Sequence, residues 1–220
     1  MPKAIDTIIF DLDGTLLDTL TDLTNSVNDA MVRQGFPTHS EEAVRQMVGN
    51  GIYVLMEKAV PGGRECPAFR TCLEDFRNHY EAHKKDYTKP FPGIMDFLGK
   101  ASKEGYKMAV VSNKFDLAVK GLCRDFFHPY ITAAIGESAQ IARKPAPDTV
   151  FEAMRQLHSA PGQCVYVGDS DVDLATAQNA GIPCISVSWG FRSREFLLGH
   201  GASAIAGSTK ELWDILKSMA

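Results

Sequence analysis

Residues 5–15 read Ile-Asp-Thr-Ile-Ile-Phe-Asp-Leu-Asp-Gly-Thr, a short apolar run that ends abruptly in charge at Asp11. A run of this length, rich in β-branched residues and closed by a turn signal, is typical of a strand buried on both faces. Such strands occur mainly in parallel sheets that helices cover on both sides. The stretch therefore sets the expected class of the whole chain.

The rest of the chain repeats this pattern. Further short apolar runs lie at 108–111, 131–135, 164–167 and 184–187, and helical patterns lie at 94–103, 117–124, 150–157, 172–180 and 211–218. Strands that alternate with helices predict βαβ units with right-handed crossovers. The sequence thus predicts an α/β protein with a Rossmann-like parallel sheet.

One long segment lacks this alternation of strands and helices. From Leu16 to about Thr88 there is no convincing strand, and apolar residues spaced by three or four predict a helix from Leu16 to about Gln34. Thr38 and Glu41 form a capping-box pattern ahead of a second helix. Further helices are expected at 52–60 and 68–85. We therefore expect an α/β core at 1–16 and 89–220, with an α-helical domain inserted at 17–88.

Composition excludes several classes of function. The 220 residues contain 23 Lys and Arg against 27 Asp and Glu, a net charge of −4, and no basic run that would indicate nucleic-acid binding. Neither a signal peptide nor a membrane-spanning run is evident at the N-terminus. The five cysteines contain no CxxC pair, which favours a reducing compartment. We expect a cytoplasmic monomer or homodimer that binds neither membrane nor nucleic acid.

Polar side chains follow the expected strands at their carboxyl ends, where ligands bind in open α/β sheets. Asp11 and Asp13 follow the first strand, Ser112 follows the second, and Asp169 follows the fourth. Lys144 stands before a helix, in the sequence Lys-Pro-Ala-Pro-Asp. Carboxylates, a hydroxyl and a lysine are thus expected at one edge of one sheet.

This set of residues is typical of phosphoryl chemistry. Clustered carboxylates repel one another unless a hard cation such as Mg²⁺ lies among them. Asp11 could then attack phosphorus to form an aspartyl-phosphate, with Asp13 as general acid and base. Lys144 would offset negative charge, while Ser112 and nearby backbone N–H groups would hold the phosphoryl oxygens.

The order of these motifs resembles the haloacid dehalogenase superfamily of phosphohydrolases. The matching motifs are the DxDGT run at 11–15, the serine at Ser112, the lysine at Lys144 and the GDxxxD run at 168–173. The resemblance covers almost the whole chain and implies that residues 17–88 are a small helical cap. It implies that Asp11 is the nucleophile and a Mg²⁺ ligand and that Asp13 is the acid/base, with its main-chain carbonyl on the metal. It further implies that Asp169 is a metal ligand and that Asp173 supports the metal site without contacting the metal itself. Thr15 and Asn113 are expected to join Ser112 and Lys144 in binding phosphate.

Within this superfamily the chain is most similar to phosphoglycolate phosphatases. The similarity rests on Val-Gly-Asn-Gly-Ile at 48–52, Trp-Gly-Phe at 189–191 and Gly-Ala at 201–202. It implies a small phosphorylated metabolite as substrate, 2-phosphoglycolate first, with Asn50 and Gly51 contacting it. A phosphomutase resembling β-phosphoglucomutase shares every core residue and remains open. Phosphatases for a sugar phosphate, a nucleotide or pyrophosphate also remain open as alternatives.

Other interpretations of single motifs are weaker. An EF-hand starting at Asp11 would need Gly and Glu where Leu16 and Asp22 stand. His79 and His83 share a helix face but lack the glutamate of a zinc-protease motif, so we expect an exposed face. Arg192, Arg194 and Glu195 are expected to be solvated loop charges, and Trp213 a core residue. A signalling receiver module would have no use for the helical insertion.

Overall fold

The computed structural model describes residues 5–219, and residues 1–4 and 220 of the expected core lie outside this range. The chain forms two compact units. One contains the residues up to Leu17 together with those from Pro90 onward, and the other is Asp18–Lys89. Each unit is described by itself below.

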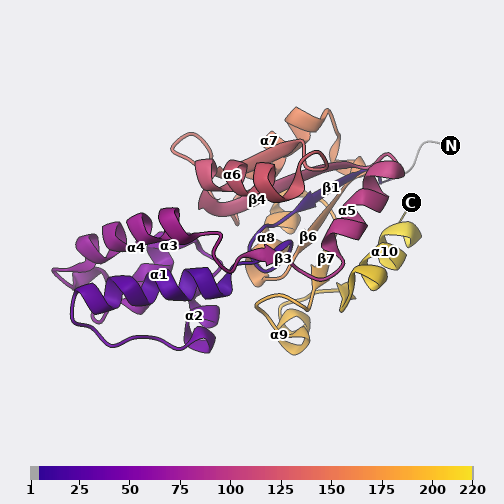
Figure 1. The fold of residues 1–220 in the computed structure, drawn as a ribbon. Helices are drawn as coiled ribbons and strands as arrows, with labels where there is room; N and C mark the ends of the chain where they lie inside the picture. The colour runs from indigo at the N-terminus through magenta and orange to yellow at the C-terminus, as the bar shows by residue number, and fades with distance from the viewer. Residues whose placement is uncertain (1–4, 220) are drawn as a thin grey trace. The chain divides into compact units, whose positions relative to one another are not determined.

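The first unit is built on a parallel sheet of six strands (Figure 1). In order across the sheet, the strands are β5 (Ala133–Glu137), β4 (Lys107–Phe115), β1 (Thr7–Phe10), β6 (Cys164–Gly168), β7 (Cys184–Val187) and β8 (Ile205–Ala206). This arrangement confirms the predicted α/β class with a Rossmann-like sheet.

Alternate residues of the central strands pack on opposite faces of the sheet, because successive side chains of a strand point to opposite sides. In β1, Ile8 and Phe10 belong to one apolar cluster and Ile9 to the other, and all three are fully buried. Burial on both faces explains why this strand is apolar without alternation.

Helices cover both faces of the sheet. Helices α5 (Ile94–Lys103), α6 (Asp116–Phe127) and α10 (Thr209–Ser218) pack on one face. Helices α7 (Asp148–Leu157) and α8 (Asp171–Ala180) pack on the other. Trp213 packs into the first cluster, as predicted.

The order of the strands reverses at β1. The chain runs from β1 outward to β4 and β5, then returns to the other side of β1 to form β6, β7 and β8. Ligands bind where strand order reverses in this way, outside the carboxyl ends of the strands. The residues that follow β1, β4 and β6 therefore meet at one place.

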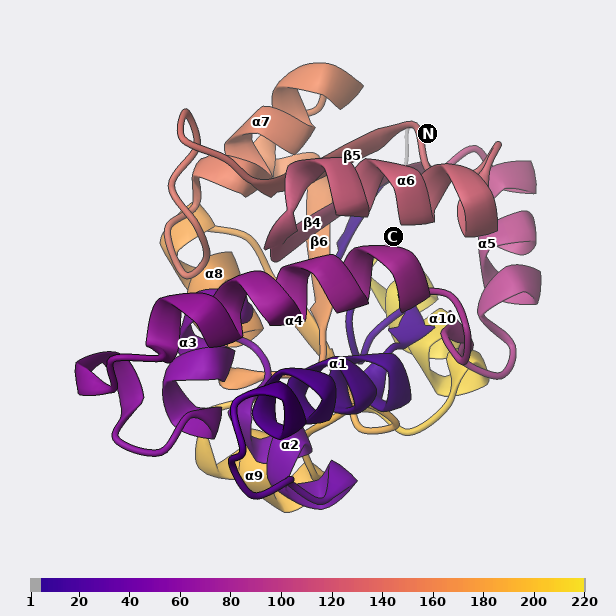
Figure 2. The ribbon, with the colours of Figure 1, turned by 60° about the vertical axis from the view of Figure 1, so that its left-hand side comes forward.

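The second unit contains only helices apart from its two connections. They are α1 (Leu20–Arg33), α2 (Glu41–Met47), α3 (Gly51–Ala59), the short 3₁₀ turn η1 (Gly63–Glu65) and α4 (Phe69–His83). Helices α1 and α4 lie side by side in both views (Figures 1 and 2). Their buried faces include Val27 and Met31 of α1 and Phe76 and Tyr80 of α4.

Several expected boundaries in this region were wrong. The first helix begins at Leu20 rather than Leu16, because Leu16 and Leu17 are fully buried in the cluster of the α/β unit. The second helix is capped by Ser40, whose hydroxyl accepts from the Ala43 N–H, and not by Thr38. The segment also contains a strand that was not predicted.

That strand, β2 (Leu17–Asp18), pairs with β3 (Lys89–Pro90) in a separate two-stranded sheet. The two strands are the two connections between the units. Four further short elements escaped prediction: η1, β8, η2 (Pro161–Gln163) and α9 (Arg194–Gly199). Arg194 and Glu195 thus begin a helix capped by Ser193, and the expectation of loop charges there was wrong. Among the described residues, no helix combines the length and hydropathy needed to cross a membrane.

Asp22 holds the two ends of the helical unit together. Its carboxylate, 1% exposed, accepts hydrogen bonds from the Thr88 N–H at 2.8 Å, the Thr88 hydroxyl at 2.7 Å and the Tyr87 N–H at 3.1 Å. One buried side chain therefore satisfies three donors of the returning chain, and the two on the buried Thr88 would otherwise lack an acceptor in the interior.

We predict that Asp22→Ala lowers the free energy of unfolding by roughly 2–4 kcal/mol, because buried donors that lose their acceptor keep their full desolvation penalty. Urea unfolding followed by circular dichroism measures the loss. Asp29→Ala is the matched control, since that aspartate lies on the same helix and pairs with an exposed Arg33. Equal effects of the two substitutions would contradict the proposed anchoring.

Candidate active site

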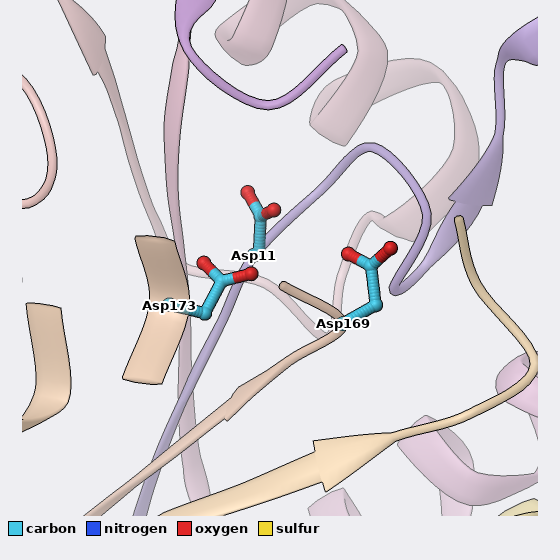
Figure 3. A group of neighbouring side chains, drawn as sticks. All are labelled: Asp11, Asp169 and Asp173. Atoms are coloured by element: carbon cyan, nitrogen blue, oxygen red, sulfur yellow. The ribbon is translucent and has the colours of Figure 1, made fainter. Parts of the chain in front are cut away.

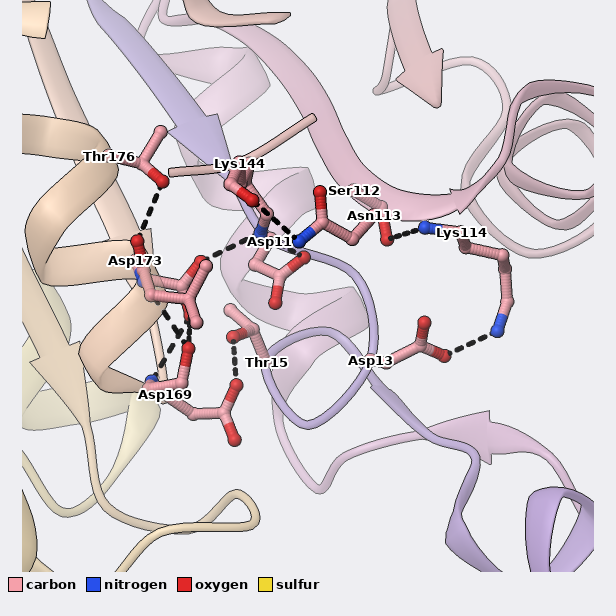
Figure 4. A network of polar contacts seen from close by, with 12 residues as sticks. Asp11, Asp13, Thr15, Ser112, Asn113, Lys114, Lys144, Asp169, Asp173 and Thr176 are labelled. Atoms are coloured by element: carbon pink, nitrogen blue, oxygen red, sulfur yellow. Dashed lines mark hydrogen bonds and ion pairs between the residues drawn. The ribbon is translucent and has the colours of Figure 1, made fainter. Parts of the chain in front are cut away.

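Asp11 lies at the carboxyl end of β1, the point to which the sheet topology directs a ligand. Its N–H donates to the Val167 carbonyl at 2.9 Å, which continues the ladder between β1 and β6 by one residue. The side chain then points into a group of polar residues from neighbouring strands (Figure 4). Its carboxylate contacts the ammonium of Lys144 at 2.8 Å.

Lys144 is almost fully buried, at 2% exposure, and its ammonium has three acceptors. It donates to Asp11 at 2.8 Å, to Asp173 at 2.8 Å and to the Tyr166 hydroxyl at 3.1 Å. An ammonium carries three N–H donors. The protein's own side chains therefore occupy the full donor capacity of Lys144, which fixes its position beside Asp11.

Asp173 is similarly committed to the protein. One carboxylate oxygen accepts from Lys144 and from the Tyr166 hydroxyl at 2.9 Å. The other accepts from the Ser170 N–H at 3.1 Å and the Ser170 hydroxyl at 2.6 Å. Ser170 and Asp173 form a capping box at the start of α8. Asp173 thus joins a helix N-terminus to the buried lysine.

Asp169 follows β6 and is held by two neighbouring segments, one at Thr15 and one at Phe191. It accepts from the Thr15 hydroxyl at 3.1 Å and from the Phe191 N–H at 2.7 Å. A Cβ on Gly14 would lie 2.3 Å from its carboxylate, and a Cβ on Gly190 would lie 2.5 Å from it. Gly14 also has a φ of +86°, which other residues rarely adopt. Glycine at these two positions lets the backbone close around Asp169.

The three carboxylates form one acidic group (Figure 3). Asp11, Asp169 and Asp173 each offer an oxygen, and these oxygens lie within 4.8 Å of one another. Burial and the charge of Asp173 raise the pKa of Asp11 well above its usual value. The same two causes raise the pKa of Asp169 to about 7. Burial and repulsion between the carboxylates therefore both oppose ionisation of this group, and Lys144 offsets these effects only in part at Asp11.

The pKa of Lys144 is shifted toward the charged form of the side chain. Burial alone would lower its pKa, but the carboxylates of Asp11 and Asp173 outweigh burial and raise the pKa above its usual value. The lysine therefore remains charged. A single buried cation among three carboxylates leaves a net negative charge, and that imbalance is what a bound metal cation would relieve.

The donor set fits such a cation. Oxygen ligands from carboxylates suit hard divalent ions. Because four donors already occupy Asp173, the residues that fit as direct ligands are Asp11 and Asp169. Asp173 instead accepts a hydrogen bond from Lys144 and so fixes the position of the ammonium. The structure thus contains a buried acidic group able to hold a metal cation.

Asp13 does not belong to this group. Its carboxylate pairs with the ammonium of Lys114 at 2.9 Å, and their side chains are 14% and 5% exposed. In the view of Figure 4, Asp11 lies between this pair and Asp173. Asp11 and Asp13 both point to the carboxyl edge of the sheet, but toward different cations.

Ser112 and Asn113 lie in the last, irregular part of β4, beside this edge. The register between β4 and β5 shifts between Val111 and Phe115. The Ser112 hydroxyl accepts from the Lys114 N–H at 3.2 Å, and the Asn113 amide donates to the Lys144 carbonyl at 3.1 Å. Asn113 therefore ties the lysine loop to β4.

The structure brings most of the predicted site residues together. Asp11, Thr15, Lys144, Asp169 and Asp173 form one connected set, and Asp13, Ser112 and Asn113 adjoin it. The remaining two, Asn50 and Gly51, lie in the helical unit at the start of α3.

Sequence reasoning missed Tyr166, Lys114 and the backbone of Phe191. Tyr166 reads as an ordinary strand residue, so its hydroxyl contacts could not be foreseen.

Comparison with known proteins places this site in a family context. Residues 8–187 match the family model of the haloacid dehalogenase-like hydrolases. A phosphoglycolate phosphatase from Mesorhizobium japonicum is 31% identical over 196 residues, which are 85% of this chain and 84% of the relative. One from Chromobacterium violaceum is 28% identical over 221 residues, 98% of each chain.

Two solved structures are also similar to this chain. A protein from Lactobacillus delbrueckii subsp. bulgaricus, proposed to be a phosphoglycolate phosphatase, has a TM-score of 0.92 and 35% identity, covering 96% of this chain and 98% of its own. CbbY from Rhodobacter sphaeroides, crystallised with phosphate, has a TM-score of 0.76 and 27% identity, covering 94% and 96%.

We predict that Tyr166→Phe lowers the free energy of unfolding by about 1–3 kcal/mol, because it leaves one donor of the buried Lys144 without its acceptor. The change removes a single oxygen and leaves the packing of the ring intact. Thermal melting measures the effect. Tyr87→Phe serves as control, because the Tyr87 side chain is 62% exposed, and a surface substitution of this kind changes stability by less than about 0.5 kcal/mol. Unchanged stability of Tyr166→Phe would show that Lys144 does not depend on the phenol.

Proposed function

This chain belongs to the haloacid dehalogenase-like hydrolases, and we propose that it is a Mg²⁺-dependent phosphatase that hydrolyses a small phosphomonoester through an aspartyl-phosphate. One observation carries the proposal. A carboxylate at the carboxyl end of β1, Asp11, is held at 2.8 Å by a buried lysine and shares an acidic group with Asp169. A nucleophile and a cation site thus coincide.

Asp11 is the proposed nucleophile. One of its oxygens contacts Lys144, which fixes the carboxylate and leaves the other oxygen to attack phosphorus. The new bond joins that oxygen to phosphorus as the bond from phosphorus to the alcohol oxygen breaks. Substrate phosphate carries negative charge into an acidic site, so Mg²⁺ held by Asp11, Asp169 and the main-chain carbonyl of Asp13 would supply charge neutralisation there.

Asp13 is the proposed general acid and base. It is two residues from Asp11, and its carboxylate is held by Lys114 instead of Lys144. In the first step it gives its proton to the departing alcohol oxygen. In the second it takes a proton from the water that attacks the aspartyl-phosphate, which releases inorganic phosphate and restores Asp11.

The remaining polar residues at this edge have supporting roles in the proposal. Ser112, Thr15 and Asn113 lie around Asp11, where the Ser112 hydroxyl and the Asn113 amide can hold the phosphoryl oxygens. The Thr15 hydroxyl donates to Asp169 and would have to leave it to bind phosphate. Lys144 acts chiefly by its charge, since its three donors are engaged by the protein. Asp173 positions that charge.

The proposed substrate is 2-phosphoglycolate, as representative of small phosphorylated metabolites. The relatives from Mesorhizobium japonicum and Chromobacterium violaceum bear the name phosphoglycolate phosphatase and align over most of both chains. CbbY, crystallised with phosphate, shares the fold and supports phosphate as the group that is bound. The acidic group beside Asp11 supports the metal dependence.

The helical unit is the proposed cap of this enzyme. Such a cap would exclude bulk water during phosphoryl transfer and contribute selectivity. Asn50 and Gly51 begin α3, and Gly51 has a φ of +79°. In this role the backbone at Gly51 and the Asn50 amide would contact the substrate.

A phosphate-release assay over 2-phosphoglycolate, sugar phosphates, nucleotides and pyrophosphate tests the proposal. We expect multiple turnover, with the highest kcat/KM for 2-phosphoglycolate. Following glucose 1-phosphates by NMR separates hydrolysis from transfer. Isomerisation of the sugar without release of phosphate would identify a phosphomutase and contradict the proposed hydrolysis.

We predict that Asp11→Asn lowers kcat by at least about 10⁴-fold, because it removes the nucleophilic oxygen while changing the side-chain volume very little. Steady-state phosphate release measures the loss, and circular dichroism verifies the fold. Asp214→Asn, on the exposed side of α10, is the control and should retain full activity. Substantial turnover by Asp11→Asn would exclude Asp11 as the nucleophile.

Removal of divalent metal should stop activity reversibly. We expect excess chelator to abolish phosphate release and added Mg²⁺ to restore it, since the uncompensated carboxylates repel a phosphate dianion. Asp169→Asn should raise the Mg²⁺ concentration needed for half-maximal activity by about tenfold or more. Full activity in excess chelator would refute the metal assignment.

A further inference from the structure

We propose that His79 and His83 of α4 form a binding site for a divalent transition-metal cation such as Zn²⁺. This site is not part of the acidic group at Asp11, and the observations behind it concern the helical unit alone. The inference goes beyond the proposed function and does not depend on it, since no step of the hydrolysis uses either histidine.

The two histidines have the spacing of a pair of metal ligands on a helix. Residues four apart lie on the same helix face, one turn from each other. Here the two imidazole rings are stacked, with their centroids 4.4 Å apart. In zinc proteases two histidines bind the metal at the same spacing, and the glutamate of that motif is a general base rather than a ligand. Its absence from this chain therefore removes hydrolytic chemistry but leaves the two ligand positions.

The hydrogen bond of His79 determines which of its ring nitrogens carries the proton. Nδ1 of His79 lies 3.0 Å from the hydroxyl of Ser26, on α1. That hydroxyl donates its single proton to the Asp22 carbonyl at 2.8 Å, because a carbonyl can only accept. Ser26 therefore accepts from His79, and Nδ1 of His79 is the donor. In the neutral imidazole the lone pair is then on Nε2.

His83 is held in the same tautomer by a different partner. Its Nδ1 lies 2.8 Å from a carboxylate oxygen of Asp86. An ionised carboxylate can only accept, so Nδ1 of His83 is the donor. Histidines that bind a metal commonly donate their other ring N–H to a carboxylate, which orients the ring and makes the ligating nitrogen more basic. Asp86 thus gives His83 the surroundings of a metal ligand.

Both Nε2 atoms are available to a cation. Neither one forms a hydrogen bond with another residue of the described range 5–219. The His83 side chain is 48% exposed and His79 is half-buried, so a cation can reach the pair and water can complete its coordination. Imidazole nitrogen suits Zn²⁺, Cu²⁺ and Ni²⁺, whereas Mg²⁺ prefers oxygen. The pair would therefore select a transition metal over Mg²⁺.

His200 of the α/β unit provides a matched control. Its Nδ1 also has an acceptor, the Phe196 carbonyl at 2.8 Å. Its ring is also exposed and stacked, with centroids 4.0 Å apart, but on the phenyl ring of Phe196 rather than on an imidazole. His200 thus shares the tautomer and the stacking of the proposed ligands and differs in the residue that lies beside it.

The experiment is a Zn²⁺ titration of the whole protein, followed by NMR of the isotope-labelled histidine side chains with Mg²⁺ in excess. Histidine resonances report on imidazole ligands directly, so Zn²⁺ bound to carboxylates does not obscure the result. The proteins compared are wild type, His83→Gln, Asp86→Ala and His200→Gln. Each substitution changes an exposed side chain.

Before Zn²⁺ is added, Nδ1 should carry the proton in both His79 and His83. Zn²⁺ should then shift their two Nε2 resonances together, at concentrations that leave His200 unchanged. In His83→Gln the Zn²⁺ affinity measured at His79 should fall at least about tenfold, because a second ligand held nearby adds to affinity at little further cost. Asp86→Ala should weaken binding about ten- to a hundredfold. His200→Gln should bind Zn²⁺ as wild type does.

Four outcomes would overturn the inference. These are a proton on Nε2 of either histidine in the metal-free protein, no Nε2 shift with Zn²⁺, shifts at His200 equal to those at His79, and an unchanged affinity at His79 in His83→Gln. Equal shifts at His200 would mean that Zn²⁺ binds only to single surface histidines. None of these measurements follows phosphate release, so the proposed phosphatase function stands or fails separately.

Discussion

The contact between Asp11 and Lys144 is the interaction on which the rest of the site depends. It joins the end of β1 to the loop before α7, and through Asp173 it extends to the start of α8. Two carboxylates and a phenol surround one buried ammonium, so each member supplies a partner that the others need. Removing any one of them would leave a buried polar group unsatisfied, which costs far more than the contact itself contributes. The sheet brings these segments together, and the ion pairs then fix the distances between their side chains.

Much of this arrangement could be predicted because it follows from simple rules. The apolar run before Asp11 indicates a strand buried on both faces, and the carboxyl ends of parallel strands meet at one edge. The motif positions therefore predicted that Asp11, Lys144 and Asp169 would converge, and they do. The strength of the prediction lay in the order of the motifs, since Ser112 or Lys144 alone would be an ordinary residue at the end of a strand or the start of a helix.

The errors have physical causes as well. Leu16 continues the helical spacing of Leu20 and Leu23, but burial against the α/β core takes it out of the helix. Threonine and serine are both common at helix N-caps, so hydrophobic periodicity does not distinguish Thr38 from Ser40 as the cap. Tyr166 and Lys114 escaped because a hydroxyl contact across the sheet and an irregular strand depend on three-dimensional register. Hydrophobic pattern carries little information about either.

The charge distribution explains why Tyr166 matters. The acidic group needs a cation that stays in place. Lys144 meets this need, because three acceptors consume its donors and its neighbours raise its pKa. Tyr166 supplies one of these acceptors, so a strand residue without charge of its own helps to hold the ammonium beside Asp11. The geometry around the nucleophile therefore depends on the interior of the sheet as well as on the motif residues at its edge.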